Sequence, residues 1–280
     1  MIKAIFSQIL DRKRKAMAQL RADPSSRDFR ERALEIRKNV APHRLLRAME
    51  SESQRPNIIA EFKRRSPSAG MIRDDLTVNE IVRCYERGGA CAISVLTDEY
   101  FDGSIVDLRA ARSGTKLPLL RKDFIIDPIQ ILEAAIAGAD AVLLIVAALD
   151  DLPLGQLRAL AEDELGLDAL VEVHTSGELR RASNAGAKLI GVNNRDLRTF
   201  RVSLDTSERL IAEAPRHRIM VSESGLHDPR SLRHLQELGF RGFLIGEALM
   251  RAPDPTAALR DLLTATENRQ PTAVSTGARQ

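Results

Sequence analysis

The sequence lacks tryptophan, and its two tyrosines and eight phenylalanines make up only 4% of the 280 residues. Proteins that bind single-stranded nucleic acid stack bases on aromatic side chains, so this scarcity argues against that class. Charge of one sign is also missing, because 42 Lys and Arg face 39 Asp and Glu for a formal net charge of +3. A surplus this small gives no global basic field, and we expect no nucleic-acid partner.

Cysteine is nearly absent, with only Cys84 and Cys91 in the chain. Two cysteines cannot build the disulfide framework of a secreted domain, so we expect reduced thiols and a cytoplasmic location. Apolar residues 2–10 precede the basic run Arg12–Lys15, whereas a secretory signal places its positive charge first. No apolar run approaches the roughly 18 residues of a membrane span, and we expect no membrane partner.

Short apolar runs recur along the chain, alternating with helical patterns, several of which end in glycine. The runs are nearly continuous in Val, Ile, Leu and Ala, which is typical of parallel strands buried on both faces. There are eight, at Asn57–Phe62, Cys91–Leu96, Leu117–Arg121, Ala141–Val146, Ala169–Val173, Leu189–Asn193, Arg218–Ser222 and Gly242–Ile245. Eight such units predict an α/β fold of the closed (β/α)8, or TIM-barrel, type. The alternative is an open doubly wound sheet, which usually has fewer strands and a G-x-G-x-x-G turn that is missing here.

The pattern divides the chain into three parts. Residues 1–55 are expected to form an N-terminal helical extension that caps the barrel, beginning with an amphipathic helix near residues 2–20. Residues 56–265 are expected to form the barrel. Residues 266–280 are polar and are expected to be a flexible C-terminal tail.

Polar residues gather where the predicted strands end, at the face where barrel active sites form. Side chains alternate along a strand, so Glu61 shares a face with Lys63, Glu172 with His174, and Asn193 with Arg195. Burying such groups unpaired is costly, so their convergence indicates ion pairs or chemistry. For any one of them, capping the barrel or pointing outward is the alternative.

Two glycine turns follow the last two predicted strands, at Ser224-Gly225 and Gly246-Glu247. Backbone N–H groups that glycine exposes at helix starts bind phosphate, and barrels often build that site after strands seven and eight. The pair predicts a phosphate site. Metal binding is not predicted, because no His, Cys, Asp or Glu cluster has ligand spacing. His174 could be an acid or base, although a loop-capping role is the favoured interpretation.

Six motifs in order resemble the indole-3-glycerol phosphate synthase family, from the N-terminal helices to about residue 264. They are Ile59–Ser68, Leu120–Ile125, Leu170–His174, Gly191–Leu197, Ser222–Gly225 and Phe243–Met250. Some members of that family carry Ser where this chain has Glu247, which leaves the backbone N–H unchanged. The family also has an extension over the barrel mouth.

The resemblance implies that 1-(2-carboxyphenylamino)-1-deoxyribulose 5-phosphate is converted to indole-3-glycerol phosphate, CO2 and water, without metal or organic cofactor. It implies that Lys122 is the general acid for ring closure. A lysine among other cations in a dry mouth can have its pKa lowered towards working pH, and we expect this of Lys122. Glu172 would be a second catalytic group, and Glu61 and Lys63 would act as a pair.

The resemblance also implies binding roles. Asn193 and Glu223 would bind substrate hydroxyls, Ser66 and Arg195 the anthranilate end, and Phe101 and Phe124 the aromatic ring. The phosphate would lie against Ser224, Gly225, Gly246 and Glu247. We expect a monomer or weak homodimer whose partner is this phosphorylated small molecule, with residues 64–74 forming a lid.

Other functions remain as alternatives. Another phosphate-binding barrel of the same pathway, such as phosphoribosylanthranilate isomerase or a tryptophan synthase α subunit, would share the architecture. The isomerase needs a Cys/Asp pair, whereas the first predicted strand here ends in Glu61-Phe62-Lys63. A non-catalytic barrel would have no reason to place charged groups on three strand ends, and an arginine-rich nucleic-acid binder would show steep salt dependence.

Overall fold

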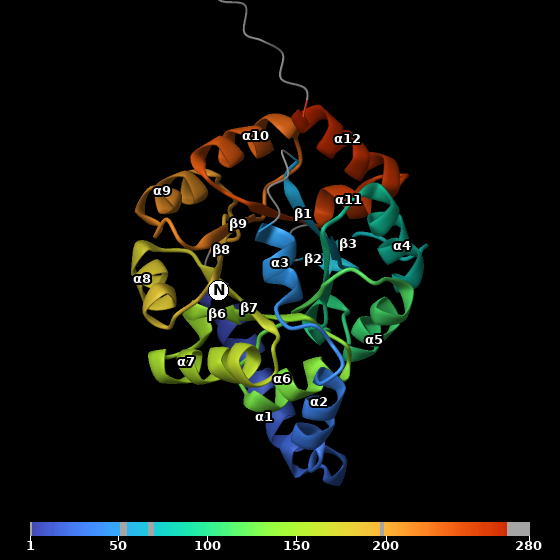
Figure 1. Cartoon of the computed structure of the whole chain (residues 1–280), viewed down its shortest axis with the longest axis vertical. Coiled ribbons are helices and arrows are strands. Elements are labelled where there is room, and N and C mark those ends of the chain that lie inside the picture. The colour runs from blue at the N-terminus through green and yellow to red at the C-terminus, as the bar shows by residue number, and fades with distance from the viewer. Residues whose placement is uncertain (1, 51–54, 67–69, 197–198, 268–280) are drawn as a thin grey trace, which may run out of the picture.

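The structure is a closed parallel barrel wrapped by helices, seen along its axis in Figure 1. This computed structural model describes residues 2–50, 55–66, 70–196 and 199–267. The barrel strands are β1 (Asn57–Phe62), β4 (Ala92–Leu96), β5 (Leu119–Lys122), β6 (Ala141–Ile145), β7 (Asp168–Val173), β8 (Leu189–Asn193), β9 (Ile219–Glu223) and β10 (Gly242–Ile245). β1 pairs in parallel with both β4 and β10, which closes the ring. The predicted (β/α)8 barrel is therefore confirmed, and the open sheet is excluded.

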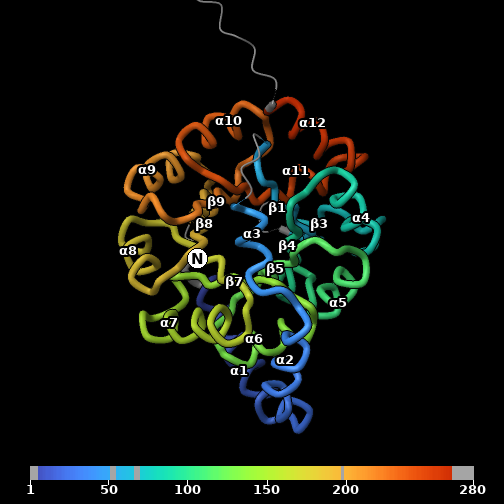
Figure 2. The backbone as a smooth tube through the Cα atoms, in the orientation of Figure 1, coloured from blue at the N-terminus to red at the C-terminus, as the bar shows by residue number. Residues whose placement is uncertain are grey.

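Helices follow the strands and form the outer layer, as the tube in Figure 2 shows. They are α4 (Val78–Gly88), α5 (Ile105–Gly114), α6 (Pro128–Ile136), α7 (Asp151–Ala159), α8 (Ser176–Asn184), α9 (Asp205–Glu213), α10 (Pro229–Leu238), α11 (Glu247–Arg251) and α12 (Pro255–Glu267). Local sequence fixes their ends: α4 begins with a Thr77–Glu80 capping box and stops at left-handed Gly89. Residues 268–280 of the expected tail lie outside the described residues.

Shorter elements fill the connections. A two-stranded antiparallel pair, β2 (Arg65–Ser66) and β3 (Gly70–Met71), lies in the connection after β1. The remaining short turns of helix are η1 (Pro24–Ser26), η2 (Glu99–Phe101), η3 (Val146–Ala148) and η4 (Leu160–Glu164).

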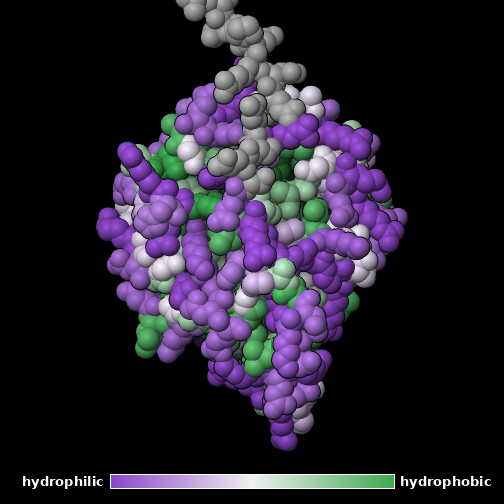
Figure 3. Space-filling model, in the orientation of Figure 1, coloured by the Kyte–Doolittle hydropathy of each residue, from purple (hydrophilic) through white to green (hydrophobic). Residues whose placement is uncertain are grey.

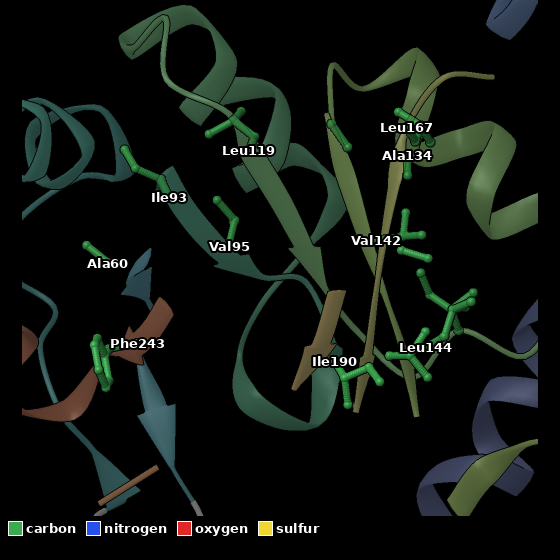
Figure 4. Close-up of a cluster of buried hydrophobic side chains, with 14 of the residues drawn as sticks. Ala60, Ile93, Val95, Leu119, Ala134, Val142, Leu144, Leu167, Ile190 and Phe243 are labelled. Atoms are coloured by element: carbon green, nitrogen blue, oxygen red, sulfur yellow. The ribbon is translucent and has the colours of Figure 1, made fainter. Parts of the chain in front are cut away.

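The strands bury apolar side chains on both faces. Ile93, Val95, Leu119 and Phe243 belong to the layer between strands and helices, part of which Figure 4 shows. A second cluster fills the barrel interior, with Ile59, Leu120, Leu143, Leu170 and Leu244 among its members. Because side chains alternate, the same period that buries Ile59 inside also turns Glu61 inward, one layer closer to the mouth.

The N-terminal extension comprises α1 (Ile2–Ala22), α2 (Phe29–Arg37) and α3 (Arg44–Glu50). α3 crosses the centre of the barrel in Figure 1 and closes its N-terminal end. The Asp168 carboxylate at the start of β7 accepts the N–H groups of Leu45 and Leu46 at 2.8 and 3.0 Å. Leu45 and Met49 are buried against the interior cluster. This end is opposite the mouth, which is where the resemblance placed the family's extension.

A buried ion cluster fixes the extension to the same end of the barrel. Asp140, just before β6, is 1% exposed and meets three arginines. Its oxygens lie 3.6 Å from Arg37, 2.8 Å from Arg44 and 3.0 Å from Arg112. These arginines come from α2, α3 and α5, so one carboxylate ties three helices to the barrel.

One face of the molecule is mostly polar. Figure 3 shows the face carrying α3 as mainly hydrophilic, with small separated hydrophobic areas. None of the helices in the described part of the chain is both long and apolar enough to cross a membrane.

Candidate active site at the barrel mouth

A cavity of about 680 Å³ opens at the C-terminal ends of the barrel strands. Most of the residues that the sequence singled out lie around it. These are Glu61, Lys63, Phe101, Lys122, Phe124, Glu172, Asn193, Arg195, Glu223, Ser224, Gly225, Gly246 and Glu247. The remaining candidate, Ser66, has its backbone in β2, and its side chain is outside the described part of the structure.

The floor of the cavity is a cluster of buried charges from four strands. The Lys122 Nζ atom on β5 lies 3.3 Å from Glu172 Oε2 on β7 and 3.3 Å from Glu223 Oε2 on β9. Lys63, just after β1, lies 2.9 Å from Glu61 Oε1. The period-two alternation places these groups inward, and barrel closure brings them together.

The expectation of a lowered pKa for Lys122 is wrong. Burial alone would lower the pKa of this ammonium group, but Glu172, Glu223 and Glu61 outweigh burial and raise it. The sequence argument assumed cationic neighbours, whereas the nearest charges are carboxylates from other strands. Lys122 is therefore fully protonated at neutral pH in the free protein.

The three carboxylates differ in acidity. Burial on its own would raise the pKa of Glu61. The nearby cations Lys63 and Lys122 lower it by more than burial raises it, so the net shift of this pKa is downward. Glu172 is also shifted downward, because Lys122, His174 and a hydrogen bond from Asn193 outweigh its burial. Burial raises the pKa of Glu223 to about 7, against the effect of Lys122. Neither Glu223 oxygen accepts a hydrogen bond from the residues that the structure describes. Glu223 is thus partly protonated near neutral pH and is available to a ligand.

Two glycines make room for these carboxylates. A Cβ atom at Gly191 on β8 would lie 2.0 Å from Glu223 Oε1, and one at Gly246 would lie 2.5 Å from Glu61 Oε1. Sequence reasoning missed Gly191 and assigned Gly246 to phosphate alone. Glycine inside an apolar strand is the available signal, because it often marks a close approach of another group.

One wall of the cavity is aromatic. Phe101 and Phe124 are stacked with centroids 6.4 Å apart and an interplanar angle of 16°. Phe6 of α1 meets Phe124 edge-on at 6.0 Å, and Ile9 of α1 also lines the cavity. Sequence reasoning predicted an amphipathic helix there but did not place Phe6 or Ile9 in the site.

A buried ion pair holds α1 at the mouth. Lys13 Nζ lies 2.7 Å from Asp98 Oδ2 and 2.6 Å from Asp123 Oδ1, and the lysine side chain is only 11% exposed. Asp98 follows β4 and Asp123 follows Lys122 on β5. Lys13 belongs to the basic run Arg12–Lys15, and nothing in that run indicates from the sequence that this lysine is buried. Its burial fixes Phe6 beside the aromatic wall.

The opposite side of the mouth is built from backbone turns. Ser224 and Gly225 both have left-handed backbones, with φ of 67° and 79°. Ser224 Oγ donates to Asn193 Oδ1 at 2.9 Å, and the same oxygen accepts the Arg195 N–H at 3.0 Å. Glu247 is turned toward Arg251, whose Nε lies 3.1 Å from Glu247 Oε1. This pair offsets the carboxylate charge beside the turn.

His174 follows β7, and its backbone N–H donates to Glu178 Oε2 at 2.7 Å, so the Glu178 side chain closes this loop. Across the described ranges, no group of three His, Cys, Asp or Glu side chains is arranged to hold a metal ion.

Comparison with known proteins agrees with the motifs. The family model described as indole-3-glycerol phosphate synthase matches residues 6–262. A protein of Koribacter versatilis (strain Ellin345) named indole-3-glycerol phosphate synthase is 45% identical over 257 residues, which cover 91% of this chain and 97% of that protein.

Solved structures of other barrels share the fold alone. Thiamine phosphate pyrophosphorylase from Pyrococcus furiosus has a TM-score of 0.56 at 19% identity, covering 76% of this chain and 96% of that one. KGPDC from Streptococcus mutans has a TM-score of 0.57 at 17% identity, covering 76% and 98%. The sequence matches extend over the extension, the barrel strands and the charged mouth, and the chain belongs to the indole-3-glycerol phosphate synthase family.

Proposed function

We propose that the chain catalyses its family's reaction at this mouth. Ring closure, decarboxylation and dehydration convert 1-(2-carboxyphenylamino)-1-deoxyribulose 5-phosphate to indole-3-glycerol phosphate. The observation that carries the proposal is the buried Lys122, held between Glu172 and Glu223 on the floor of a cavity with one aromatic wall. Such a floor can move protons, and such a wall can hold an aromatic ring.

The substrate spans the mouth in this proposal. Its phosphate lies against the turns at Ser224-Gly225 and Gly246-Glu247, where backbone N–H groups are hydrogen-bond donors. Its aromatic ring lies against Phe101 and Phe124 on the other side. The ribulose carbons then lie over the charged floor.

Ring closure needs an acid at the ketone. A ring carbon attacks the carbonyl carbon, and a proton must reach the carbonyl oxygen as negative charge builds there. Lys122 carries that proton. Because Glu172 and Glu223 stabilise the protonated lysine and raise its pKa, Lys122 gives up the proton only when the carbonyl oxygen has become strongly basic. Glu172 stabilises the positive charge that the ring holds until CO2 leaves.

Loss of water needs an acid and a base. Lys63 and Glu61, 2.9 Å apart, supply the second pair. Lys63 holds the substrate carboxylate or protonates the departing hydroxyl, and Glu61 orients it or accepts a proton. Asn193 and Glu223 bind substrate hydroxyls, while Ser66 and Arg195 serve the anthranilate end.

The rival isomerase lacks its residues here. Cys84 lies on α4, and Cys91 precedes β4 at the N-terminal end of the barrel. Neither thiol lines the cavity. The Cys/Asp pair which that reaction needs is therefore not available at the mouth.

A metal-free assay tests the proposal. Purified protein in buffer with a chelator is mixed with the carboxyphenylamino-deoxyribulose phosphate, and indole fluorescence is followed. Appearance of the indole product with release of one CO2 supports the proposal. No indole product from folded protein contradicts it. Conversion of phosphoribosylanthranilate to the carboxyphenylamino-deoxyribulose phosphate, with no indole product, would favour the isomerase.

Gly191→Ala is expected to reduce kcat/KM by about 10²-fold, in the range of a lost acid–base group. The new methyl group would take the space of the Glu223 carboxylate, which must move away from Lys122. Steady-state kinetics measures the loss. Gly155→Ala is the matched control, because nothing lies within 4 Å of a Cβ atom there. Equal activity of both variants would contradict the role assigned to Glu223.

Three further expectations stay predictions. These are the cytoplasmic location, the monomer or weak homodimer, and the lid. In the expected lid region, the Arg64 guanidinium donates two hydrogen bonds to the Asp107 carboxylate, at 2.7 and 2.8 Å. Residues 67–69 of the expected lid lie outside the described residues.

A further inference from the structure

His174 lies directly behind Glu172. It follows β7, two residues after Glu172, so both side chains point to the same side of the strand. Its side chain is 12% exposed, and it does not line the cavity. The ring is therefore a largely buried neighbour of the site that lies outside the cavity lining.

The ring is placed between two carboxylates. Nδ1 lies 3.3 Å from Glu178 Oε2, and Nε2 lies 3.5 Å from Glu172 Oε1. Glu178 is itself fixed, since it lies in the first turn of α8 and accepts the His174 backbone N–H. Nε2 is buried and makes no hydrogen bond within the described residues. A small movement of either side chain would bring His174 Nε2 and Glu172 Oε1 from 3.5 Å to hydrogen-bond distance.

Glu172 is thus flanked by two nitrogen groups. Its Oε2 faces Lys122 at 3.3 Å, and its Oε1 faces His174. We propose that His174 is a positioning residue, which holds Glu172 ionised and aligned from the side opposite Lys122. The inference rests on the proposed function, because it assigns His174 a role through Glu172.

The charges around His174 agree with this role. The charged groups that act on it are Glu178 on α8, Glu172 on β7 and Glu223 on β9. Burial lowers the pKa of His174, but Glu178, Glu172 and Glu223 outweigh it and raise the pKa above its ordinary 6.5. The cation in turn lowers the pKa of Glu172. Without it, Glu172 would take up a proton at a higher pH than in the wild type.

The test compares pH profiles of His174→Gln with the wild type. The neutral glutamine is expected to move the acidic limb of kcat/KM upward by about one pH unit, a tenfold loss below that limb. The loss at alkaline pH should be smaller. Glu178→Gln keeps the acceptor for the backbone N–H but removes the charge, so it should shift the limb in the same direction by less. His234→Gln is the control, because that ring pairs with Glu208 on the outer helices at 2.9 Å.

Histidine NMR of the protein without substrate separates this inference from the proposed function. The His174 ring should titrate above pH 6.5 in the wild type and lower in Glu178→Gln. A ring that titrates at or below 6.5 overturns the inference, as does an unshifted acidic limb in folded His174→Gln. If the wild type does not turn over the substrate, the proposed function fails, and the NMR titration still decides whether the His174 cation exists. If His174→Gln does not fold, Glu178→Gln and the NMR titration decide.

Discussion

Lys122→Met is expected to lower kcat by at least 10²–10⁴-fold, roughly the contribution of one general acid. Methionine fills similar space but has no proton to give to the ketone oxygen. Loss of the Lys122 ammonium group also removes the positive charge that interacts with all three carboxylates, Glu61, Glu172 and Glu223. Their pKa values rise, so the carboxylates lose charge in the pH range in which they would act. Both effects lower turnover.

Single-turnover kinetics measures this loss, and circular dichroism checks that the barrel is intact. Lys116→Met is the matched control, because Lys116 is exposed and its side chain lies away from the cavity. It should keep wild-type turnover. If Lys122→Met retained near-wild-type kcat, Lys122 would be removed from the mechanism, and Lys63 would become the candidate acid for ring closure.

Asp140→Asn is expected to lower the free energy of unfolding by about 3 kcal/mol, the lower end of the cost of breaking a buried ion pair. Asparagine leaves three arginines around a neutral group, and its amide cannot accept all of their hydrogen bonds. The lower end applies because Arg44 and Arg112 are each 26% exposed, whereas Arg37 is 6% exposed. In a chain of this size the loss corresponds to a Tm decrease of about 6–12 °C.

Thermal unfolding with and without urea measures the effect of Asp140→Asn. Asp163→Asn is the control, because this 55%-exposed carboxylate pairs with Arg158 at the surface and should cost about 1 kcal/mol or less. At 25 °C Asp140→Asn should keep its kcat, since Asp140 lies at the opposite end of the barrel from the cavity. An unchanged Tm would show that the three arginines are stabilised by other contacts.

The barrel could be predicted because each strand is buried on both faces. Such a strand needs apolar residues at nearly every position, and a continuous apolar run is visible in the sequence. The same alternation placed Glu61 and Lys63 on one inward face, and they do pair there. The position of α3 could not be predicted in this way. The apolar residues Leu45 and Met49 of this short helix could pack on any apolar surface. Only the closed barrel shows that the apolar surface which they cover is the N-terminal end of the barrel interior.

The electrostatics of the site could not be predicted from local spacing. The pKa of Lys122 depends on carboxylates that lie about 50 and 100 residues further along the chain. Strand register decides how near they come, and the sequence does not give register. The same holds for Gly191, whose missing side chain matters only because Glu223 lies on the next strand.

The N-terminal extension is attached to both ends of the barrel by separate contacts. Lys13 forms ion pairs at the mouth, and α3 packs on the N-terminal end of the strands. The residues that shape the aromatic wall from outside the barrel are therefore physically remote from those that seal its base. A substitution at Phe6 or Ile9 of α1 would therefore alter the aromatic side of the cavity without changing the contacts by which Leu45 and Met49 of α3 close the other end of the barrel.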